Sequence, residues 1–226
     1  MTVRTEKKYT FNQVDKNSVR DWLLGSALGF KEVFHKREVN SIYFDSHDYF
    51  CYEENLSGVS KRSKARLRWY DHIDPLSSKA TFEMKVKSNH LGNKLSHQFN
   101  FTDLDLTSSS HNLIIQLRNL LPIEMLPYFD TFSEPSLLVS YQREYYEDMQ
   151  KKVRVTLDDE IIFSRPGYEN LFSMNDNQKV PMSHGVLEVK IENASEAEWK
   201  KMFFSNYLIR GGRHSKYAIG INATSS

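Results

Sequence analysis

Four segments of the chain carry charged side chains at every second position, and this pattern constrains the fold more than any other feature. The segments are residues 65–70, 82–87, 153–158 and 187–192. A period of two is that of a β-strand, whose successive side chains point to opposite faces of a sheet. Each predicted strand therefore has one apolar face and one charged face. If the strands close on one another, the charged faces line a common lumen, which would suit a polyanion and its metal ion.

Length and composition indicate one domain. A chain of 226 residues is large enough to bury a core, and no linker or repeat divides it, so we expect a single domain over residues 1–226. Hydrophobic residues make up 39% and charged residues 26%, and the mean hydropathy is -0.58, which argues against a membrane protein. The net charge of +1, from 30 basic and 29 acidic residues, argues against a general nucleic-acid-binding surface.

The sequence also predicts the compartment. Residues 1–8 lack the apolar core of a secretory signal. The one cysteine, Cys51, cannot form a disulfide within the chain, which agrees with a reducing compartment. We therefore expect a cytoplasmic location, with no membrane insertion of this chain.

Alternation and turn signals predict more strands than helices. The predicted strands are about 4–12, 37–45, 62–72, 79–88, 94–102, 137–147, 151–163 and 185–193. The predicted helices are about 15–28, 111–121 and one from Ser195, where Ser195 and Glu198 form a capping box. Because the helices are too few to alternate with the strands, we expect an α+β fold, an antiparallel β-barrel with peripheral helices.

Each charged motif also has a purely structural interpretation. A single strand with alternating arginines, such as the one with Arg66 and Arg68, is usually the solvated face of a sheet. Four strands with the same pattern weaken that interpretation without removing it. Glu83 and Glu188 could likewise serve only as ion-pair partners of nearby lysines, and the sequence leaves both roles open. No Ser/His/Asp or Cys/His arrangement stands out, so covalent catalysis is not expected.

Eight short motifs occur in order along the chain. They are Glu6-Lys7-Lys8-Tyr9, Ser41-Ile42-Tyr43-Phe44-Asp45, Arg66-Leu67-Arg68-Trp69-Tyr70, Glu83-Met84-Lys85, Tyr141-Gln142-Arg143, Val153-Arg154-Val155-Thr156-Leu157-Asp158, Leu187-Glu188-Val189-Lys190 and Ser215-Lys216-Tyr217. Together they resemble the catalytic domain of the vacuolar transporter chaperone (VTC) polyphosphate polymerases, a branch of the triphosphate tunnel metalloenzymes. The resemblance covers nearly the whole chain. It implies an antiparallel tunnel barrel, in agreement with the alternation.

The resemblance also implies the roles of individual residues. The implied catalytic residues are Lys8, Arg66, Arg68, Lys85, Arg143, Arg154 and Lys216. These same side chains would bind phosphate groups, together with Tyr70, Lys94, Tyr141 and Lys190. The implied metal ligands are Glu188, Glu6 and Glu83, which would hold Mn²⁺ or Mg²⁺. The residue types fit, because arginine binds phosphate oxygens bidentately and carboxylates suit hard cations.

The activity implied by the resemblance is ATP-dependent synthesis of polyphosphate. ATP and inorganic polyphosphate would be the partners, no nucleic acid would be bound, and a separate membrane partner is left open. Related tunnel triphosphatases begin with an E-x-E-x-K motif, whereas this chain has Arg4, Glu6 and Lys8 at those positions. The missing glutamate favours the polymerase over a triphosphatase acting on tripolyphosphate or a nucleoside triphosphate. A non-catalytic polyphosphate-binding module is the third alternative.

Overall fold

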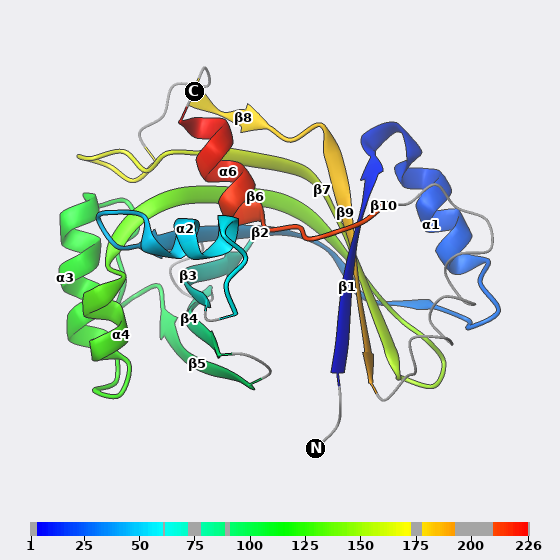
Figure 1. Cartoon of the computed structure of the whole chain (residues 1–226), viewed down its shortest axis with the longest axis horizontal. Coiled ribbons are helices and arrows are strands. Elements are labelled where there is room, and N and C mark those ends of the chain that lie inside the picture. Colours follow the sequence, from blue (N-terminus) through cyan, green and yellow to red (C-terminus); the bar gives the residue numbers. More distant parts are fainter. Residues whose placement is uncertain are drawn as a thin grey trace. The chain divides into compact units, whose positions relative to one another are not determined.

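The structure is a computed structural model, and it describes residues 4–60, 62–71, 78–88, 91–172, 178–192 and 210–225 (Figure 1). The strands are β1 (Arg4–Asn12), β2 (Lys31–Asp45), β3 (Arg62–Tyr70), β4 (Lys79–Ser88), β5 (Leu91–Asn100), β6 (Glu134–Glu147), β7 (Val153–Ser164), β8 (Val180–Pro181), β9 (His184–Glu192) and β10 (Arg210–Gly211). The helices are the 3-10 helix η1 (Gln13–Asp15), α1 (Lys16–Leu24), α2 (Phe50–Leu56), α3 (Ser110–Leu120), α4 (Leu126–Thr131) and α6 (Lys216–Thr224).

The strands form one sheet. Its hydrogen-bonded order is β10-β1-β9-β7-β6-β2-β3-β4-β5, and β8 pairs with β7. The pairs of β1 with β9, β2 with β3, β3 with β4, β4 with β5 and β7 with β9 are all antiparallel. This confirms the predicted α+β fold class, an antiparallel sheet with a few helices. Closure of the strands around a lumen stays a prediction.

The chain divides into two compact units. The first unit consists of Met1–Arg37, Tyr141–Ile161 and Pro181–His214. The second unit consists of Glu38–Ser140, Ile162–Val180 and Ser215–Ser226. Strands β2, β6, β7 and β8 each contribute one part to each unit. A single domain over residues 1–226 stays a prediction.

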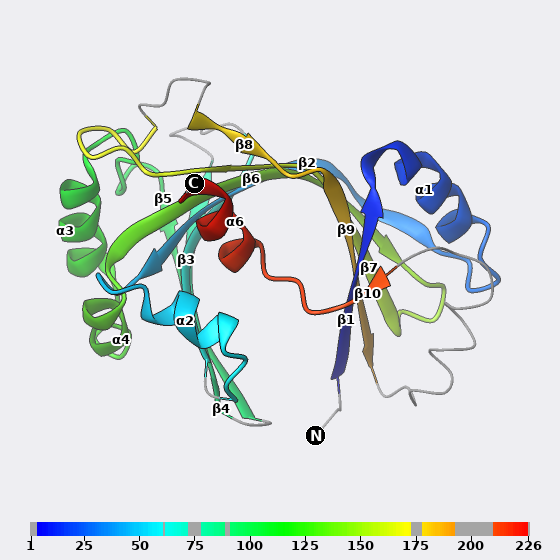
Figure 2. The same ribbon diagram turned by 45° about the horizontal axis from the view of Figure 1, so that its top comes forward.

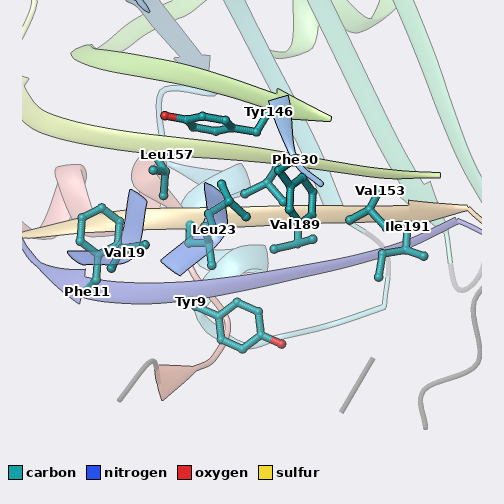
Figure 3. Packing of buried hydrophobic residues seen from close by; sticks show 12 residues of the cluster. Tyr9, Phe11, Val19, Leu23, Phe30, Tyr146, Val153, Leu157, Val189 and Ile191 are labelled. Atoms are coloured by element: carbon teal, nitrogen blue, oxygen red, sulfur yellow. The ribbon is translucent and has the colours of Figure 1, made fainter. Parts of the chain in front are cut away.

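The first unit buries one face of its strands under α1 (Figure 3). The side chains of Val19 and Leu23 are fully buried and belong to the same core as Leu157 and Val189 from the strands. The alternation places Lys8, Glu188 and their neighbours on the opposite face. Because the apolar side chains of these strands are buried under α1, the charged side chains that alternate with them must point to the opposite face.

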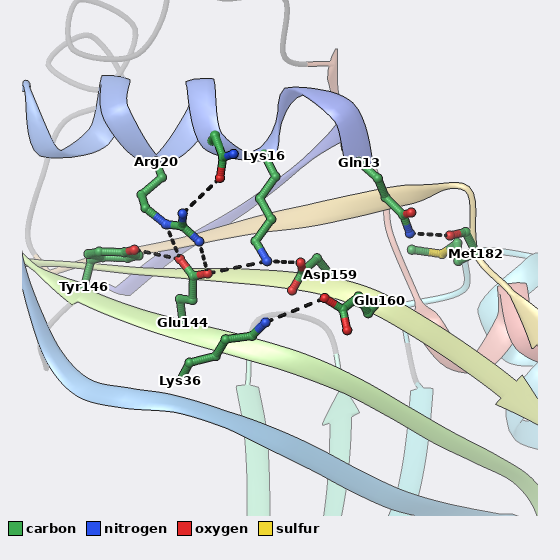
Figure 4. A network of polar contacts seen from close by, with 10 residues as sticks. Gln13, Lys16, Arg20, Lys36, Glu144, Tyr146, Asp159, Glu160 and Met182 are labelled. Carbon is green, nitrogen blue, oxygen red and sulfur yellow. Dashed lines mark hydrogen bonds and ion pairs between the residues drawn. The ribbon is translucent and has the colours of Figure 1, made fainter.

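Ion pairs also attach α1 to the sheet (Figure 4). Arg20 donates to both carboxylate oxygens of Glu144 on β6, and Tyr146 donates to the same carboxylate at 2.7 Å. Lys16 pairs with Asp159 on β7 and lies 3.6 Å from Glu144. These contacts lie on the face of the sheet that α1 covers, away from the charged face with Lys8.

The second unit has an aromatic core. Phe44 on β2, Phe82 on β4 and Phe129 on α4 make edge-to-face contacts with centroids 5.5–6.1 Å apart. Leu67 and Trp69 on β3 point to the buried face, whereas Arg66 and Arg68, which alternate with them, are only partly buried. Figure 2 shows β3 and β4 among the other elements of the unit. The two-residue pattern of this strand is therefore confirmed.

Seven of the eight predicted strands agree with the structure to within three residues. The strand predicted at 37–45 begins at Lys31, because its first six residues are exposed on both faces and show no alternation. One helix prediction also needs correction. The first helix ends at Leu24 instead of about Leu28, because Gly25 caps it and Gly29 adopts a φ of 62°. The short helices α2 and α4 and the C-terminal α6 were not predicted, because they are short or carry little apolar periodicity. The predicted helix from Ser195 lies outside the described residues.

Truncating the buried face of β3 should destabilise the second unit. Leu67 is 0% exposed, so Leu67→Ala should lower the free energy of unfolding by about 2–5 kcal/mol. Leu56→Ala is the matched control, because the Leu56 side chain is 59% exposed and its loss should have little effect. Urea denaturation measures both. Equal stability of the two variants would contradict the burial of the Leu67 side chain in the core of the second unit.

Candidate functional site

The second unit gathers basic side chains on the charged face of β3. We call this group the second-unit cluster; its residues are Tyr43, Lys64, Arg66, Arg68, Glu83, Lys94 and Lys216. Antiparallel pairing sets Arg66 opposite both Tyr43 and Glu83, so the three side chains share one face. The same alternation adds Lys64, two residues before Arg66.

Glu83 is the carboxylate among these cations. Its Oε2 accepts from Arg66 Nε at 2.6 Å and lies 2.5 Å from Arg66 Nη2. Lys94 Nζ lies 2.6 Å from Oε1, and Arg68 Nη1 lies 3.9 Å from Oε2. Burial would raise the pKa of Glu83, but Arg66 and Arg68 outweigh it and lower the pKa to about 2. Glu83 is thus ionised at neutral pH and serves as the counter-ion of the arginines.

The start of α6 joins the same cluster. Lys64 Nζ donates to Ser215 Oγ at 3.2 Å, and Ser215 caps the helix by accepting from the Ala218 amide. Lys216, the first residue of α6, acts electrostatically on Tyr43 together with Lys64. The cap therefore holds the start of α6 near β3.

The first unit has a second group, which we call the first-unit cluster: Glu6, Lys8, Arg143, Asp158, Glu188 and Lys190. Lys8 lies opposite Glu188 in the β1–β9 ladder, and its Nζ is 3.5 Å from carboxylate oxygens of both Glu6 and Glu188. Lys190 contacts the other oxygen of Glu188. Burial would raise the pKa of Glu188, but Lys8 and Lys190 outweigh it and hold the pKa well below its usual range.

Arg143 is held by a buried carboxylate. Its Nε and Nη2 donate to the two oxygens of Asp158 at 2.5 and 2.6 Å. The Asp158 side chain is 0% exposed. Burial would lower the pKa of Arg143, but the Asp158 carboxylate outweighs it and raises the pKa. The guanidinium also lies over the Tyr141 ring, 5.1 Å from its centroid, so its position is fixed on two sides.

Three predicted site residues lie at the margins of these groups. Arg154 faces the same side as Lys190, but its side chain is 58% exposed and pairs with Glu147 at 3.1 Å. Lys85 is exposed on the charged face of β4. Tyr70, the last residue of β3, is 37% exposed. Their predicted roles stay predictions.

The implied metal has a donor set of suitable chemistry in the first unit. Within the described residues, no group of three or more His, Cys, Asp or Glu side chains could hold a metal ion. Glu6 and Glu188, however, share one ammonium group, that of Lys8. Two carboxylates completed by substrate oxygens fit a hard divalent cation. Both oxygens of Glu83 are contacted by Arg66 and Lys94, as both oxygens of Glu188 are by Lys8 and Lys190, so either carboxylate would exchange cationic partners on binding a metal.

Sequence reasoning missed four contributors to the two clusters. Tyr43, Asp158 and Ser215 stand in the quoted motifs without a role, and Lys64 lies just before the motif that begins at Arg66. Alternation from Arg66 would have found Lys64. The other three depend on strand register or on the docking of α6, which the sequence pattern does not reveal.

No helix in the described ranges is long and apolar enough to cross a membrane.

Two of the solved structures that are similar to the chain are described as putative cyclases. The first is described as a putative adenylyl cyclase, HpAC1 from Hippeastrum, with a dominant triphosphatase activity. It has a TM-score of 0.55 at 12% identity, and the match covers 98% of this chain and 96% of that one. A putative adenylate cyclase from Vibrio parahaemolyticus has a TM-score of 0.45 at 10% identity, with 88% and 80% covered. The first likeness shows that the chain shares the fold of that protein.

The VTC domain model matches residues 3–225. The chain therefore belongs to the VTC domain family, as the motifs predicted. No protein with a curated function has a significant sequence match to it.

Loss of the Asp158 charge should destabilise the first unit. Asp158→Asn keeps the volume but leaves the Arg143 guanidinium buried without its counter-ion, which should cost about 3–5 kcal/mol of unfolding free energy. The control is Asp130→Asn, which breaks an exposed Arg–Asp pair and should have little effect. Denaturant unfolding compares the two, and an Asp158→Asn protein as stable as its control would contradict this account.

The stability supplied by Glu83 should be lost in acid. Because its pKa is lower in the folded protein, this stability is fully present above the ordinary value of 4.5 and disappears as pH falls through about 2. Wild-type protein and Glu83→Gln should therefore differ most in unfolding free energy at neutral pH and converge from about pH 5 to about pH 2. Glu169→Gln, at an exposed position, should show no such convergence. If the difference in unfolding free energy between wild type and Glu83→Gln stayed constant with pH, the stabilising role of the Glu83 ion pairs would be contradicted.

Proposed function

We propose that this protein is an ATP-dependent polyphosphate polymerase, which transfers the γ-phosphoryl group of ATP to the end of a growing polyphosphate chain. The observation that carries the proposal is the second-unit cluster, in which Lys64, Arg66, Arg68, Lys94 and Lys216 accompany the single carboxylate of Glu83. Such an excess of cations suits an anion with several charges. Membership in the VTC domain family supports the proposal.

The arginines of β3 provide the recognition. Arg66 already directs two nitrogens at the Glu83 carboxylate, and the same planar arrangement binds two phosphate oxygens. Arg68 keeps a buried Nε that has no hydrogen-bond partner within the described part of the chain. A phosphate oxygen would satisfy this donor after a small movement of the side chain. The arginines would thus have phosphate groups as partners in addition to Glu83.

The reaction requires no protein nucleophile. The acceptor is a terminal phosphate oxygen, which is already anionic at neutral pH. It would attack the γ-phosphorus in line with the leaving ADP oxygen, forming one P–O bond as the other breaks. Arg66, Arg68 and Lys216 would neutralise charge on the transferred group, and Lys8 and Arg143 would bind phosphates in the first unit. Arg143, fixed by Asp158, would act without reorganisation.

The divalent metal, Mn²⁺ or Mg²⁺, would be held by Glu188 and Glu6. When bound, it supplies positive charge to phosphate oxygens. Lys8 and Lys190 balance these carboxylates in its absence.

The direct test is incubation of purified protein with ATP and Mn²⁺ or Mg²⁺, followed by gel analysis of the products. We expect ADP and chains of inorganic phosphate that lengthen with time. Release of free phosphate only would support the triphosphatase alternative. The Hippeastrum protein, which is described as having a dominant triphosphatase activity, shares the fold of this chain. Tight, salt-sensitive binding of polyphosphate without turnover of ATP would instead support a binding module.

Replacing Arg66 should affect synthesis much more than folding. Arg66→Ala removes a preorganised donor and should lower kcat by about 10²–10³-fold. Arg118→Ala is the matched control, because this arginine is exposed on α3 and pairs with Asp130. Its activity should stay near that of the wild type. Melting temperatures of both variants show whether they fold, and full activity of folded Arg66→Ala would exclude a role for Arg66 in the reaction.

A further inference from the structure

Tyr43 lies within the second-unit cluster, and contacts on two sides fix its ring. Lys64 Nζ lies over the ring, 5.7 Å from its centroid, and Tyr217 of α6 stacks on it at 5.3 Å with an interplanar angle of 29°. The Tyr217 hydroxyl in turn donates to the buried Asp45 carboxylate. Tyr43 itself is 4% exposed. The ring therefore connects β3 to the start of α6.

We propose that Tyr43 is a positioning residue of the phosphate-binding cluster, and that its phenol takes up a proton when a polyphosphate binds. This inference rests on the proposed function for its ligand, a chain of phosphate groups. It does not depend on whether the protein polymerises that ligand.

The charges around Tyr43 favour ionisation of its phenol. Lys64, Arg66 and Arg68 approach from β3, and Lys216 approaches from α6. Burial would raise the pKa of Tyr43, but the four cations, with Arg66 the strongest, outweigh it and lower the pKa to about 7. In the absence of ligand, a fraction of the phenol is thus ionised at neutral pH and acts as a counter-anion in addition to Glu83, which lies on the other side of Arg66.

Acidic groups of the neighbouring elements do not remove this effect. Glu83 on β4 pairs with Arg66, and Lys85 is a further cation on the same face of that strand. Asp45 at the end of β2 is occupied by the Tyr217 hydroxyl, by the amide of the next residue, Ser46, and by the amides of Cys51 and Tyr52 at the start of α2. On β6, the uncharged Ser136 donates to the Tyr43 carbonyl at 3.1 Å.

A bound phosphate chain would replace the phenolate as the counter-anion. Once phosphate oxygens neutralise the cations, the stabilisation of the phenolate is lost and the pKa of Tyr43 rises towards its ordinary value. The phenol then takes up a proton from solvent. Because binding is linked to uptake of a proton by Tyr43, the affinity of the protein for the phosphate chain falls as pH rises above the pKa that Tyr43 has in the ligand-free site. The fall is up to about tenfold per pH unit. Below that pKa Tyr43 adds no pH dependence.

The experiment is titration calorimetry of tripolyphosphate binding, without nucleotide or metal, at several pH values and in buffers of different ionisation enthalpy. The proteins are wild type, Tyr43→Phe and, as control, Tyr168→Phe, whose ring is 86% exposed. Comparison of the three proteins also corrects the proton count for protons that tripolyphosphate and the lysines exchange on binding, because these are common to all three. We expect wild type and Tyr168→Phe to take up more protons than Tyr43→Phe. Their affinity should also fall more steeply from about pH 7 to about pH 9.

A second measurement needs no variant of Tyr43. The ultraviolet absorbance of tyrosinate in wild-type protein at mildly alkaline pH should decrease when tripolyphosphate is added. Identical proton uptake and pH profiles for wild type and Tyr43→Phe would overturn the proposal, as would an unchanged tyrosinate signal on binding. Proton-linked binding by a protein that makes no polymer would keep this inference and exclude the polymerase. Absence of tripolyphosphate binding would contradict both.

Discussion

Cations on one face of a strand repel one another, and the charged face of β3 is stable only because anionic groups lie among them. Arg66 and Arg68 stand two residues apart, so their side chains leave the sheet on the same side. The Glu83 carboxylate contacts both of them and Lys94. This one acid does not balance the cluster, and the remaining positive charge is what makes it a candidate site for phosphate.

In the first unit, carboxylates offset the repulsion between the cations. Arg143 is paired with Asp158 through both of its oxygens, and Lys8 lies between two glutamates. The three acids of the first-unit cluster balance its three bases. We therefore assign recognition of phosphate mainly to the second unit, and assign to the first unit fixed charges together with the carboxylates that suit a metal ion.

Much of the fold could be predicted because a two-residue alternation is a local property. It identified β3, β4, β7 and β9 and the direction of their charged side chains. It could not show that Asp158 would bind Arg143, because that contact depends on the pairing of β6 with β7. The cluster around Tyr43 also depends on α6, a short helix with little apolar periodicity, whose position is set by Tyr217 and Ser215. The predicted residue roles came from motif resemblance, because alternation places charges on a face without specifying their ligand.

The central claim is that phosphate groups bind to the cations of the second-unit cluster. A crystal structure with tripolyphosphate tests this most directly. We expect phosphate oxygens within hydrogen-bond distance of the Arg66 and Arg68 guanidinium groups. Phosphate groups bound without contact to Lys64, Arg66, Arg68 or Lys216 would contradict it.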